Sequence, residues 1–268
     1  MNIDLASWIK EPVTDPLWLV KDMIPRGSLV ILAGEHGTGK SMLMYNMVMA
    51  IAGGLPFLGF PTVQTSVLYF DQENGRPDSK RYWQRTWRGL GCPDPDLWAP
   101  SLHFEWFTLT EQWAKQMRTL AAEHKPGVII VDTATPALRI KDENDNAEAS
   151  RSIQELCQVQ QAANNDTTII ILKHEKTRDD TAHRRTVRGA KAWLGAVDIV
   201  MYLSRGRGGS GSLRPTVLEA DKPRAFGLQY PLAITPHWTQ PEEPMGLVFN
   251  ARRAVRGQEN AQQIDHLD

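Results

Sequence analysis

The residues with the clearest chemistry are Gly34 to Ser41, which read GEHGTGKS and fit the pattern G-x-x-x-x-G-K-[ST] at every fixed position. Residues 28–33 form an apolar run typical of a buried strand, and residues 42–52 favour a helix. The glycines let the backbone turn so that successive N–H groups point inward at a helix N-terminus, where they attract an anion. This context predicts a phosphate-binding loop.

The side chains of this loop have separate roles toward a bound nucleoside triphosphate. We expect Lys40 to reach the β- and γ-phosphates and the Ser41 hydroxyl to ligate Mg²⁺. ATP and Mg²⁺ are therefore the predicted ligands. The predicted nucleotide contacts are Gly34, Glu35, His36, Gly37, Thr38, Gly39, Lys40, Ser41 and Met42.

An aspartate at the end of a second apolar run is the predicted partner of the metal. Residues 127–132 read GVIIVD and predict a strand that ends at Asp132. In phosphate-loop enzymes an aspartate at this position holds Mg²⁺, directly or through water. Residue 133 is Thr and not Glu. The base that activates water must therefore come from another strand.

Two carboxylates follow the strand predicted at 66–70, where the chain reads SVLYFDQEN. The carboxyl ends of parallel strands meet at the ligand crevice of an open α/β sheet. A carboxylate there can orient and deprotonate the attacking water. We assign this role to Glu73, with Asp71 as the second candidate. The alternative is that both cap the helix that begins near Pro77.

The strand predicted at 167–172 ends in Lys173 and His174. A polar side chain at this tip can sense the γ-phosphate and transmit its loss to the following loop, and we assign this role to His174. Alternatively, His174 is a hydrogen-bonding residue at a buried loop start.

Basic residues gather in two stretches of the second half. Residues 173–191 hold seven Lys or Arg against three Asp or Glu, and the glycine-rich stretch 204–214 holds three Arg. Such side chains suit contact with a nucleic-acid backbone. The alternatives are a solvated charged loop for the first stretch and a hairpin tip for the second. The predicted DNA-binding residues are Lys176, Arg178, Arg184, Arg185, Arg188 and Arg207.

Composition limits the class of protein. With 41% hydrophobic and 23% charged residues and a net charge of −1, the chain has no global attraction to nucleic acid. The two cysteines have neither metal nor disulfide spacing, which favours a cytoplasmic location. Residues 41–60 carry no charge, but Asn46, Gly53 and Pro56 interrupt them, so we expect a buried helix and no membrane contact. Residues 1–12 lack the apolar core of a signal peptide.

Strand and helix patterns alternate along most of the chain, which predicts an α/β fold with a mainly parallel, twisted sheet flanked by helices. Two late strands joined by a glycine-rich connection predict a C-terminal antiparallel hairpin. The expected organisation is an N-terminal lead-in (1–27), one domain (28–250) and a flexible C-terminal tail (251–268). Strands are predicted at 28–33, 66–70, 102–106, 127–132, 167–172, 197–203, 215–221 and 245–249, and helices at 40–52, 77–90, 110–124 and 146–163.

Several of these segments together resemble the core of RecA-fold ATPases, over residues 17–230. They are PRGSLVILAGEHGTGKS, VLYFDQEN, VIIVDT, IIILKHE and TVRGAKAWLGAVDIVMYL. The closest likeness is to the plasmid RepA-type hexameric replicative helicases. The resemblance implies a homo-oligomer, in the form of a hexameric ring with ATP between subunits. It also implies that Glu73 activates water and that Asp132 serves the metal.

The resemblance further implies roles for two segments outside the loop. Lys222 and Arg224 match a K-x-R stretch that RecA-fold helicases insert into the neighbouring ATP site, where Arg224 would act as an arginine finger. The alternative is that both are surface charges on an edge strand. The loop 173–191 matches one that lines the central channel and tracks single-stranded DNA.

The residues and the resemblance together favour an ATP-hydrolysing, ring-forming DNA helicase or translocase. One alternative is a RecA- or RadA-like recombination ATPase that forms filaments. The other is a regulatory phosphate-loop ATPase with protein clients and no nucleic-acid role, which the near-neutral charge and the acidic stretch 140–148 favour.

Overall fold

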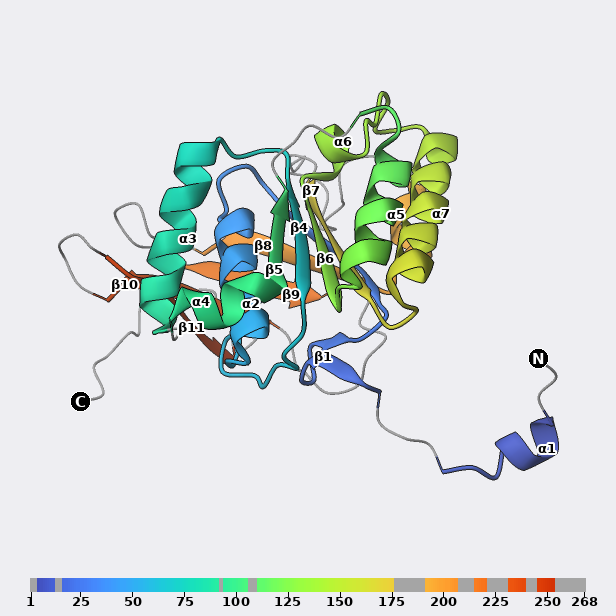
Figure 1. Cartoon of the computed structure of the whole chain (residues 1–268), viewed down its shortest axis with the longest axis horizontal. Helices are drawn as coiled ribbons and strands as arrows, with labels where there is room; N and C mark the ends of the chain where they lie inside the picture. Colours follow the sequence, from blue (N-terminus) through green and yellow to red (C-terminus); the bar gives the residue numbers. More distant parts are fainter. Residues whose placement is uncertain are drawn as a thin grey trace.

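The computed structural model describes residues 4–12, 16–91, 94–105, 110–175, 191–206, 215–220, 231–239 and 245–253. Within these residues a nine-stranded sheet runs through the molecule with helices on both faces (Figure 1). The strand order is β11-β10-β9-β8-β3-β7-β6-β4-β5. The predicted α/β class is confirmed.

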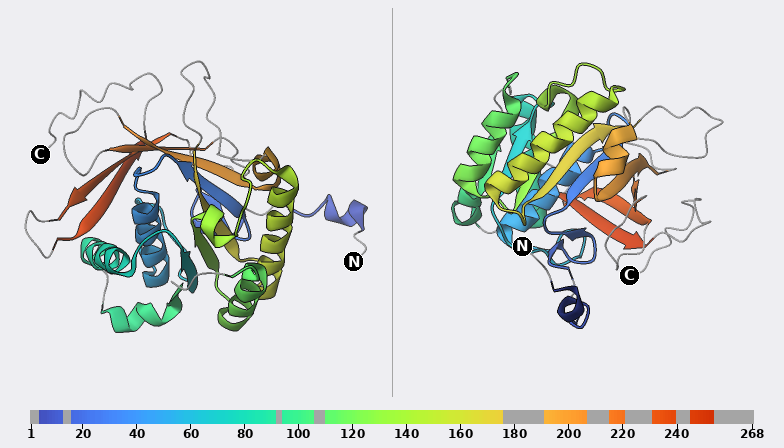
Figure 2. Two further views of the ribbon diagram at one scale, coloured as in Figure 1. Left: turned by 90° about the horizontal axis from the view of Figure 1, so that it is seen from above. Right: turned by 90° about the vertical axis from the view of Figure 1, so that its right-hand side faces the viewer.

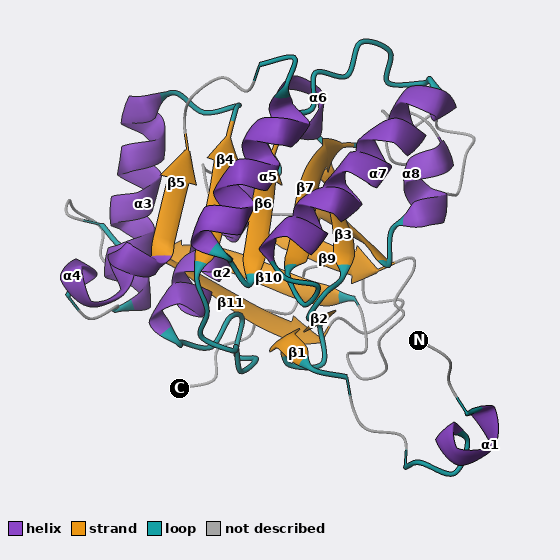
Figure 3. Ribbon diagram, turned by 45° about the vertical axis from the view of Figure 1, so that its right-hand side comes forward, coloured by secondary structure: helices purple, strands orange, loops and turns teal. Residues whose placement is uncertain are grey.

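The first part of this sheet is parallel. Neighbouring strands in the order β8-β3-β7-β6-β4-β5 pair in parallel, and in Figure 3 the arrows of β4, β5, β6 and β7 point the same way. All lie within two residues of the predicted ranges. These strands are β3 (Leu29–Gly34), β4 (Val67–Asp71), β5 (Leu102–Glu105), β6 (Val128–Asp132), β7 (Thr168–His174) and β8 (Ile199–Arg205).

The rest of the sheet is antiparallel. Strand β8 pairs with β9 (Thr216–Ala220), which confirms the predicted hairpin, and β9 pairs with β10 (Leu232–Trp238). Strand β10 in turn pairs with β11 (Leu247–Arg253), which reaches into the range expected to be a flexible tail.

Strand β10 was not predicted from the sequence, because Pro236 interrupts its pattern. Only residues 232–234 of β10 pair with β9, whereas the whole strand pairs with β11. Among the described strands, β10 therefore has β11 as its single neighbour at Pro236. A proline there needs no ladder partner for the N–H that it lacks.

Two layers of helices cover the sheet (Figures 1 and 2). One face carries α2 (Lys40–Gly53), α3 (Arg76–Leu90), α4 (Pro95–Trp98) and a 3₁₀ turn (Ala99–Ser101). The opposite face carries α5 (Trp113–His124), α6 (Ala134–Ala137), α7 (Asn146–Ala163) and α8 (Lys191–Ala196). The four longest helices were all expected.

Side chains of β3 alternate between two hydrophobic cores, as strand geometry requires. Val30 and Leu32 join the core around α2, whereas Ile31 and Ala33 join the core under α5 and α7. Helix α2 is buried over most of its length, which explains why it carries no charged residue after Lys40. No helix among the described residues is long and apolar enough to cross a membrane.

The antiparallel pair β10–β11 contacts α3 through backbone. A Cβ atom at Gly89 of α3 would lie 1.9 Å from the Leu247 carbonyl oxygen, and one at Gly246 would lie 2.6 Å from the Gly89 nitrogen. No side chain fits between these two segments. The hairpin β10–β11 therefore packs closely against α3.

The N-terminal segment divides into two parts. Strands β1 (Trp18–Val20) and β2 (Ile24–Pro25) form a small antiparallel sheet, and Val20 and Ile24 are fully buried in the core around α2. This part of the expected lead-in therefore belongs to the body. Helix α1 (Leu5–Trp8) has no buried residue and lies away from the body in Figure 1.

Candidate nucleotide-binding and catalytic site

The phosphate-binding loop connects the end of β3 at Gly34 to the start of α2 at Lys40. Gly39 is the N-cap of α2 with a φ of 90°, a left-handed conformation that glycine adopts without strain. No side chain caps this helix end. The first N–H groups of α2 are thus directed at the loop, where they and the helix dipole favour an anion.

The first glycine of the motif is required by close packing. A Cβ atom at Gly34 would lie 2.4 Å from the carbonyl oxygen of Leu203 in β8 and 2.9 Å from Thr38 Oγ1. The Thr38 hydroxyl donates to the carbonyl oxygen of Glu35 at 3.0 Å, which closes the loop internally. The loop therefore depends on β8 as well as on its own residues.

Lys40 is buried and points back into the loop. Its Nζ donates to the carbonyl oxygens of Gly34 and Glu35, both at 3.0 Å. Burial lowers the pKa of Lys40, and nearby carboxylates, led by Glu73, oppose this shift. A cation held inside a ring of backbone groups is suited to bind the phosphates that the sequence predicts.

Asp132, at the end of β6, is fully buried beside the loop. Its Oδ2 accepts a hydrogen bond from the Tyr69 hydroxyl at 2.8 Å. Burial raises the pKa of Asp132 to about 7, the charge of Asp71 adds to this rise, and the hydroxyls of Ser41 and Tyr69 oppose it. The structure therefore brings Ser41 and Asp132 together, as the sequence predicts.

The same pair fits a magnesium ion. Asp132 Oδ1 is buried without a hydrogen bond among the described residues, and a buried carboxylate oxygen needs a partner. Mg²⁺ prefers oxygen ligands and is usually held by one or two protein groups together with phosphates and water. No three His, Cys, Asp or Glu side chains of the described ranges converge as a metal site. An ion held by Ser41 and Asp132 would take its remaining ligands from phosphates and water.

Glu73 and His174 both lie beside His36 of the loop. Strand β7 pairs with β3 so that His174 is opposite Gly34, and the His174 ring stacks on His36 with centroids 6.0 Å apart. Glu73 Oε1 lies 3.9 Å from His36 Nε2. The tips of two strands and the loop thus gather the proposed base and the proposed sensor.

Protonation of His174 depends on the same surroundings. Burial lowers the pKa of its imidazole, and the charge of Lys40 lowers it further. The neutral ring is therefore favoured near pH 7 and has one nitrogen that donates and one that accepts a hydrogen bond. Such a ring can respond to a change in its phosphate neighbour.

Asp71, the second candidate base, has a different role in the structure. It is buried, and its Oδ1 accepts from the backbone N–H groups of Glu73 and Asn74 at 3.1 and 2.9 Å. Asp71 thus holds the turn that leads into α3, close to the capping role that was the alternative. The geometry leaves Glu73, whose side chain is 30% exposed, as the carboxylate that faces the loop.

Arg205 reaches the loop although its place in the sequence did not predict this. It ends β8, and its Nη2 donates to the carbonyl oxygens of His36 and Gly37 at 3.2 and 3.3 Å. The sequence placed Arg205 in the glycine-rich basic stretch. The signal for this contact is that Arg205 ends the strand next to β3, because the carboxyl ends of such strands converge on the crevice.

The remaining predicted site residues lie outside the described part of the chain. They comprise the proposed finger residues and the proposed DNA contacts, namely Lys222, Arg224, Lys176, Arg178, Arg184, Arg185, Arg188 and Arg207.

Comparisons with known proteins agree with this geometry. A crystal structure of the RadB recombinase superposes with a TM-score of 0.52, over 78% of this chain and 88% of that chain, at 19% sequence identity. At this identity the likeness concerns the fold alone, which is RecA-like. No curated protein matches the sequence. A family model described as an AAA domain matches residues 2–180, which include the loop, Glu73, Asp132 and His174. The chain therefore belongs to this AAA domain family.

Proposed function

We propose that the chain is an ATP-hydrolysing, ring-forming DNA helicase or translocase of the RepA-like type that acts on single-stranded DNA. One observation supports this most. His174, beside the phosphate-binding loop, ends the strand that leads directly into the basic stretch 176–188. Loss of a phosphate at the site would thus act on the segment that holds nucleic acid.

The described residues would provide the parts of a hydrolysis site. The N-terminus of α2 and Lys40 would bind the phosphates, and Glu73 would orient a water molecule and accept its proton. Ser41 and Asp132 would hold Mg²⁺, which neutralises phosphate charge when bound. His174 would then respond to the loss of the γ-phosphate.

Completion of the site by a second subunit remains a prediction. Arg224, with Lys222 beside it, would reach the ATP of the neighbouring subunit and stabilise charge on the transferred phosphoryl group. The proposed contacts Lys176, Arg178, Arg184, Arg185, Arg188 and Arg207 would hold single-stranded DNA along the channel of the ring.

A recombination ATPase that forms filaments is the second candidate. The structural neighbour is named as a recombinase, and the two functions share one catalytic core. Electron microscopy of the ATP-bound protein separates them, because closed rings support the first candidate and open filaments the second.

The test of the proposed function is the steady-state ATPase rate with and without single-stranded DNA. We expect DNA to stimulate the wild type, and Arg224→Ala to lower the stimulated rate about a thousandfold. A mixture of Arg224→Ala with Glu73→Gln should regain part of the rate, because some interfaces then combine an intact finger with an intact base. Arg252→Ala, at an exposed position of β11, is the matched control.

A DNA-independent rate that survives loss of Arg224 would contradict both the channel and the finger. The regulatory ATPase with protein clients would then be the better description. Salt dependence adds a second check, since neutralising Arg184, Arg185 and Arg188 should weaken DNA binding and flatten its dependence on salt.

A further inference from the structure

Asp71 is the centre of a buried hydrogen-bond network beside the proposed base. Its Oδ1 accepts from the N–H groups of Glu73 and Asn74, and its Oδ2 accepts from the hydroxyls of Tyr45 and Ser79, the latter at 3.0 Å. The side-chain amide of Asn74 adds weaker contacts at 3.3 Å. Both oxygens of this carboxylate are therefore satisfied by protein donors, as a buried charge requires.

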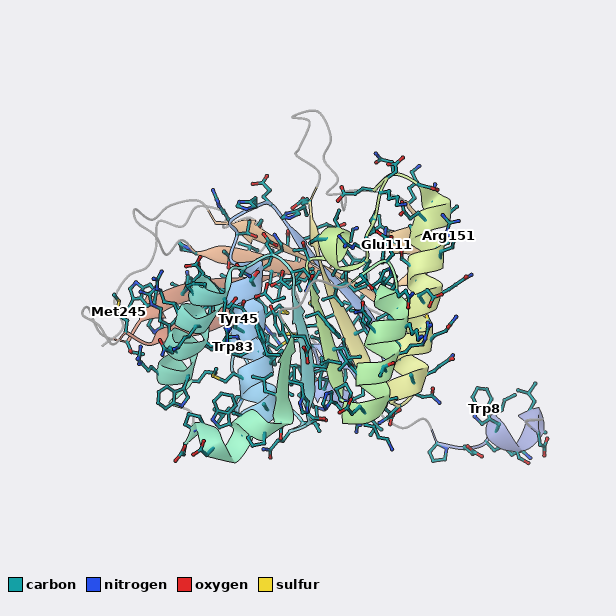
Figure 4. All side chains as sticks on the ribbon, turned by 45° about the horizontal axis from the view of Figure 1, so that its top comes forward. Trp8, Tyr45, Trp83, Glu111, Arg151 and Met245 are labelled. Atoms are coloured by element: carbon teal, nitrogen blue, oxygen red, sulfur yellow. The ribbon has the colours of Figure 1, made fainter. Side chains whose placement is uncertain are left out.

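Tyr45 connects this network to the phosphate-binding helix. It lies on α2 four residues after Ser41, so both side chains lie on the same side of the helix. Its ring is fully buried and packs 4.6 Å from Trp83 of α3 and 5.2 Å from Tyr69 of β4, measured between centroids. Figure 4 labels Tyr45 and Trp83 side by side between the two helices. The hydroxyl therefore has little freedom to leave Asp71.

The network fixes the backbone, not the side chain, of Glu73. Asp71 binds the Glu73 N–H, so the residue that would activate water is held through the turn between β4 and α3. From α2, the Tyr45 hydroxyl donates to the other oxygen of the Asp71 carboxylate, Oδ2. The chain Tyr45, Asp71, Glu73 thus links the helix that would bind phosphate to the carboxylate that would bind water.

We infer that Tyr45 and Asp71 are positioning residues that hold Glu73 at the correct distance from the phosphate-binding loop. This rests on the proposed ATPase function, in which Glu73 activates water. A displacement of a catalytic group by about 1 Å can lower a rate about a hundredfold. The network should therefore matter for turnover much more than for nucleotide binding.

Three variants test this assignment. Tyr45→Phe removes the hydroxyl and keeps the packed ring, and Ser79→Ala removes a second donor to the same oxygen. Tyr82→Phe is the matched control, because Tyr82 belongs to the same aromatic cluster, 6.1 Å from Tyr45 between ring centroids. We expect kcat of Tyr45→Phe to fall about 10- to 100-fold while the Kd for ATP changes less than about threefold. Ser79→Ala should show a smaller fall, and the control none.

A coupling experiment separates positioning from general damage. In a Glu73→Gln background there is no carboxylate left to position, so Tyr45→Phe should lower the residual rate by less than about twofold. An additive loss in that background, or a Kd that rises as much as kcat falls, would overturn the inference. An unchanged kcat in both Tyr45→Phe and Ser79→Ala would do the same.

Failure of the proposed function gives a different pattern. If Glu73→Gln alone leaves hydrolysis intact, Glu73 is not the base and the proposed chemistry is wrong. If Glu73→Gln strongly lowers hydrolysis and neither Tyr45→Phe nor Ser79→Ala lowers kcat, the chemistry stands and only the positioning role is lost. If Tyr45→Phe does not fold, Ser79→Ala decides by the same two measurements.

Discussion

Two aspartates end neighbouring strands of the sheet at the same height, and their surroundings differ in one respect. Asp71 of β4 and Asp132 of β6 are register partners, both are buried, and each accepts a hydrogen bond from a tyrosine hydroxyl. Protein donors reach both oxygens of Asp71, whereas Oδ1 of Asp132 has none among the described residues. Residue type and burial are thus the same, and the unpaired oxygen distinguishes Asp132 as the candidate ligand for a cation.

The largest expected effect is that of a substitution at Asp132 on ATP hydrolysis. Asp132→Asn should lower Mg²⁺-dependent ATP hydrolysis on the order of a thousandfold, because the ligand charge is lost. It should leave the free energy of unfolding unchanged or raise it, since a buried carboxylate with a bare oxygen is removed. Kinetics and urea denaturation measure the two effects, with exposed Asp78→Asn as the control. A large loss of stability would show that Asp132 is structural.

The reverse effect on the free energy of unfolding is expected for Asp71. Asp71→Asn replaces an acceptor with an amide nitrogen, which leaves donors from Tyr45, Ser79 or the turn unpaired. We expect the free energy of unfolding to fall by about 2 kcal/mol. Urea denaturation of Asp71→Asn and Asp132→Asn side by side gives the contrast directly. Equal stabilities of these two variants would contradict the distinction drawn between the two aspartates.

Strand β7, next to β6, carries a buried cation, Lys173, that can be compared with the two aspartates. Lys173 Nζ has no hydrogen bond among the described residues and lies 4.6 Å from the centroid of the Trp193 ring. Burial lowers the pKa of Lys173 to about 8, and the charge of Glu143 opposes the shift. The unfolded chain therefore binds more protons between pH 8 and the ordinary value of 10.5, so this group makes the protein more stable as pH rises through that window.

Lys173→Met should remove this dependence on pH. It should also raise the free energy of unfolding at pH 7 by about 2 kcal/mol, because an unpaired buried charge is replaced by an apolar chain of similar length. Urea denaturation from pH 7 to pH 10 compares the variant with the wild type. Parallel stability curves for the two proteins would show that Lys173 has an ordinary pKa.

The smallest expected effect concerns Tyr69, the tyrosine whose hydroxyl donates to Asp132. Tyr69→Phe removes the hydroxyl that donates to Asp132 Oδ2. We expect a loss of about 1 kcal/mol in the free energy of unfolding, with ATP binding retained. Thermal and urea denaturation at constant pH measure it. A gain in stability would mean that the Tyr69 hydroxyl is itself poorly accommodated.

Local patterns were sufficient for the parallel part of the fold and for the nucleotide loop. The strands before Gly34, Asp71 and Asp132 are continuous apolar runs, which only a sheet covered on both faces buries. The turn chemistry of GEHGTGKS is equally local. These features depend on residues close together in the sequence, so periodicity and spacing reveal them.

Other features depend on contacts between distant segments. The choice between Asp71 and Glu73 rests on Tyr45, which reaches Asp71 only because α2 packs beside β4 and α3. Arg205 reaches the loop because β8 lies next to β3. Strand β10 accommodates Pro236 because its pairing with β9 ends at Ile234, so no β9 residue needs the N–H that proline lacks. The roles of Arg224 and of the basic stretch remain predictions.

The pair β10–β11, which packs on Gly89, determines how far the chain can be shortened. The family match ends at residue 180, yet β10 and β11 cover the open edge of β9 and contribute Leu232, Ile234 and Leu247 to the buried interior. A chain shortened before Leu232 would present β9 as a bare edge strand, a template for pairing with other molecules. Strands outside the family match therefore cover an edge of the sheet that would otherwise be open to pairing with other chains.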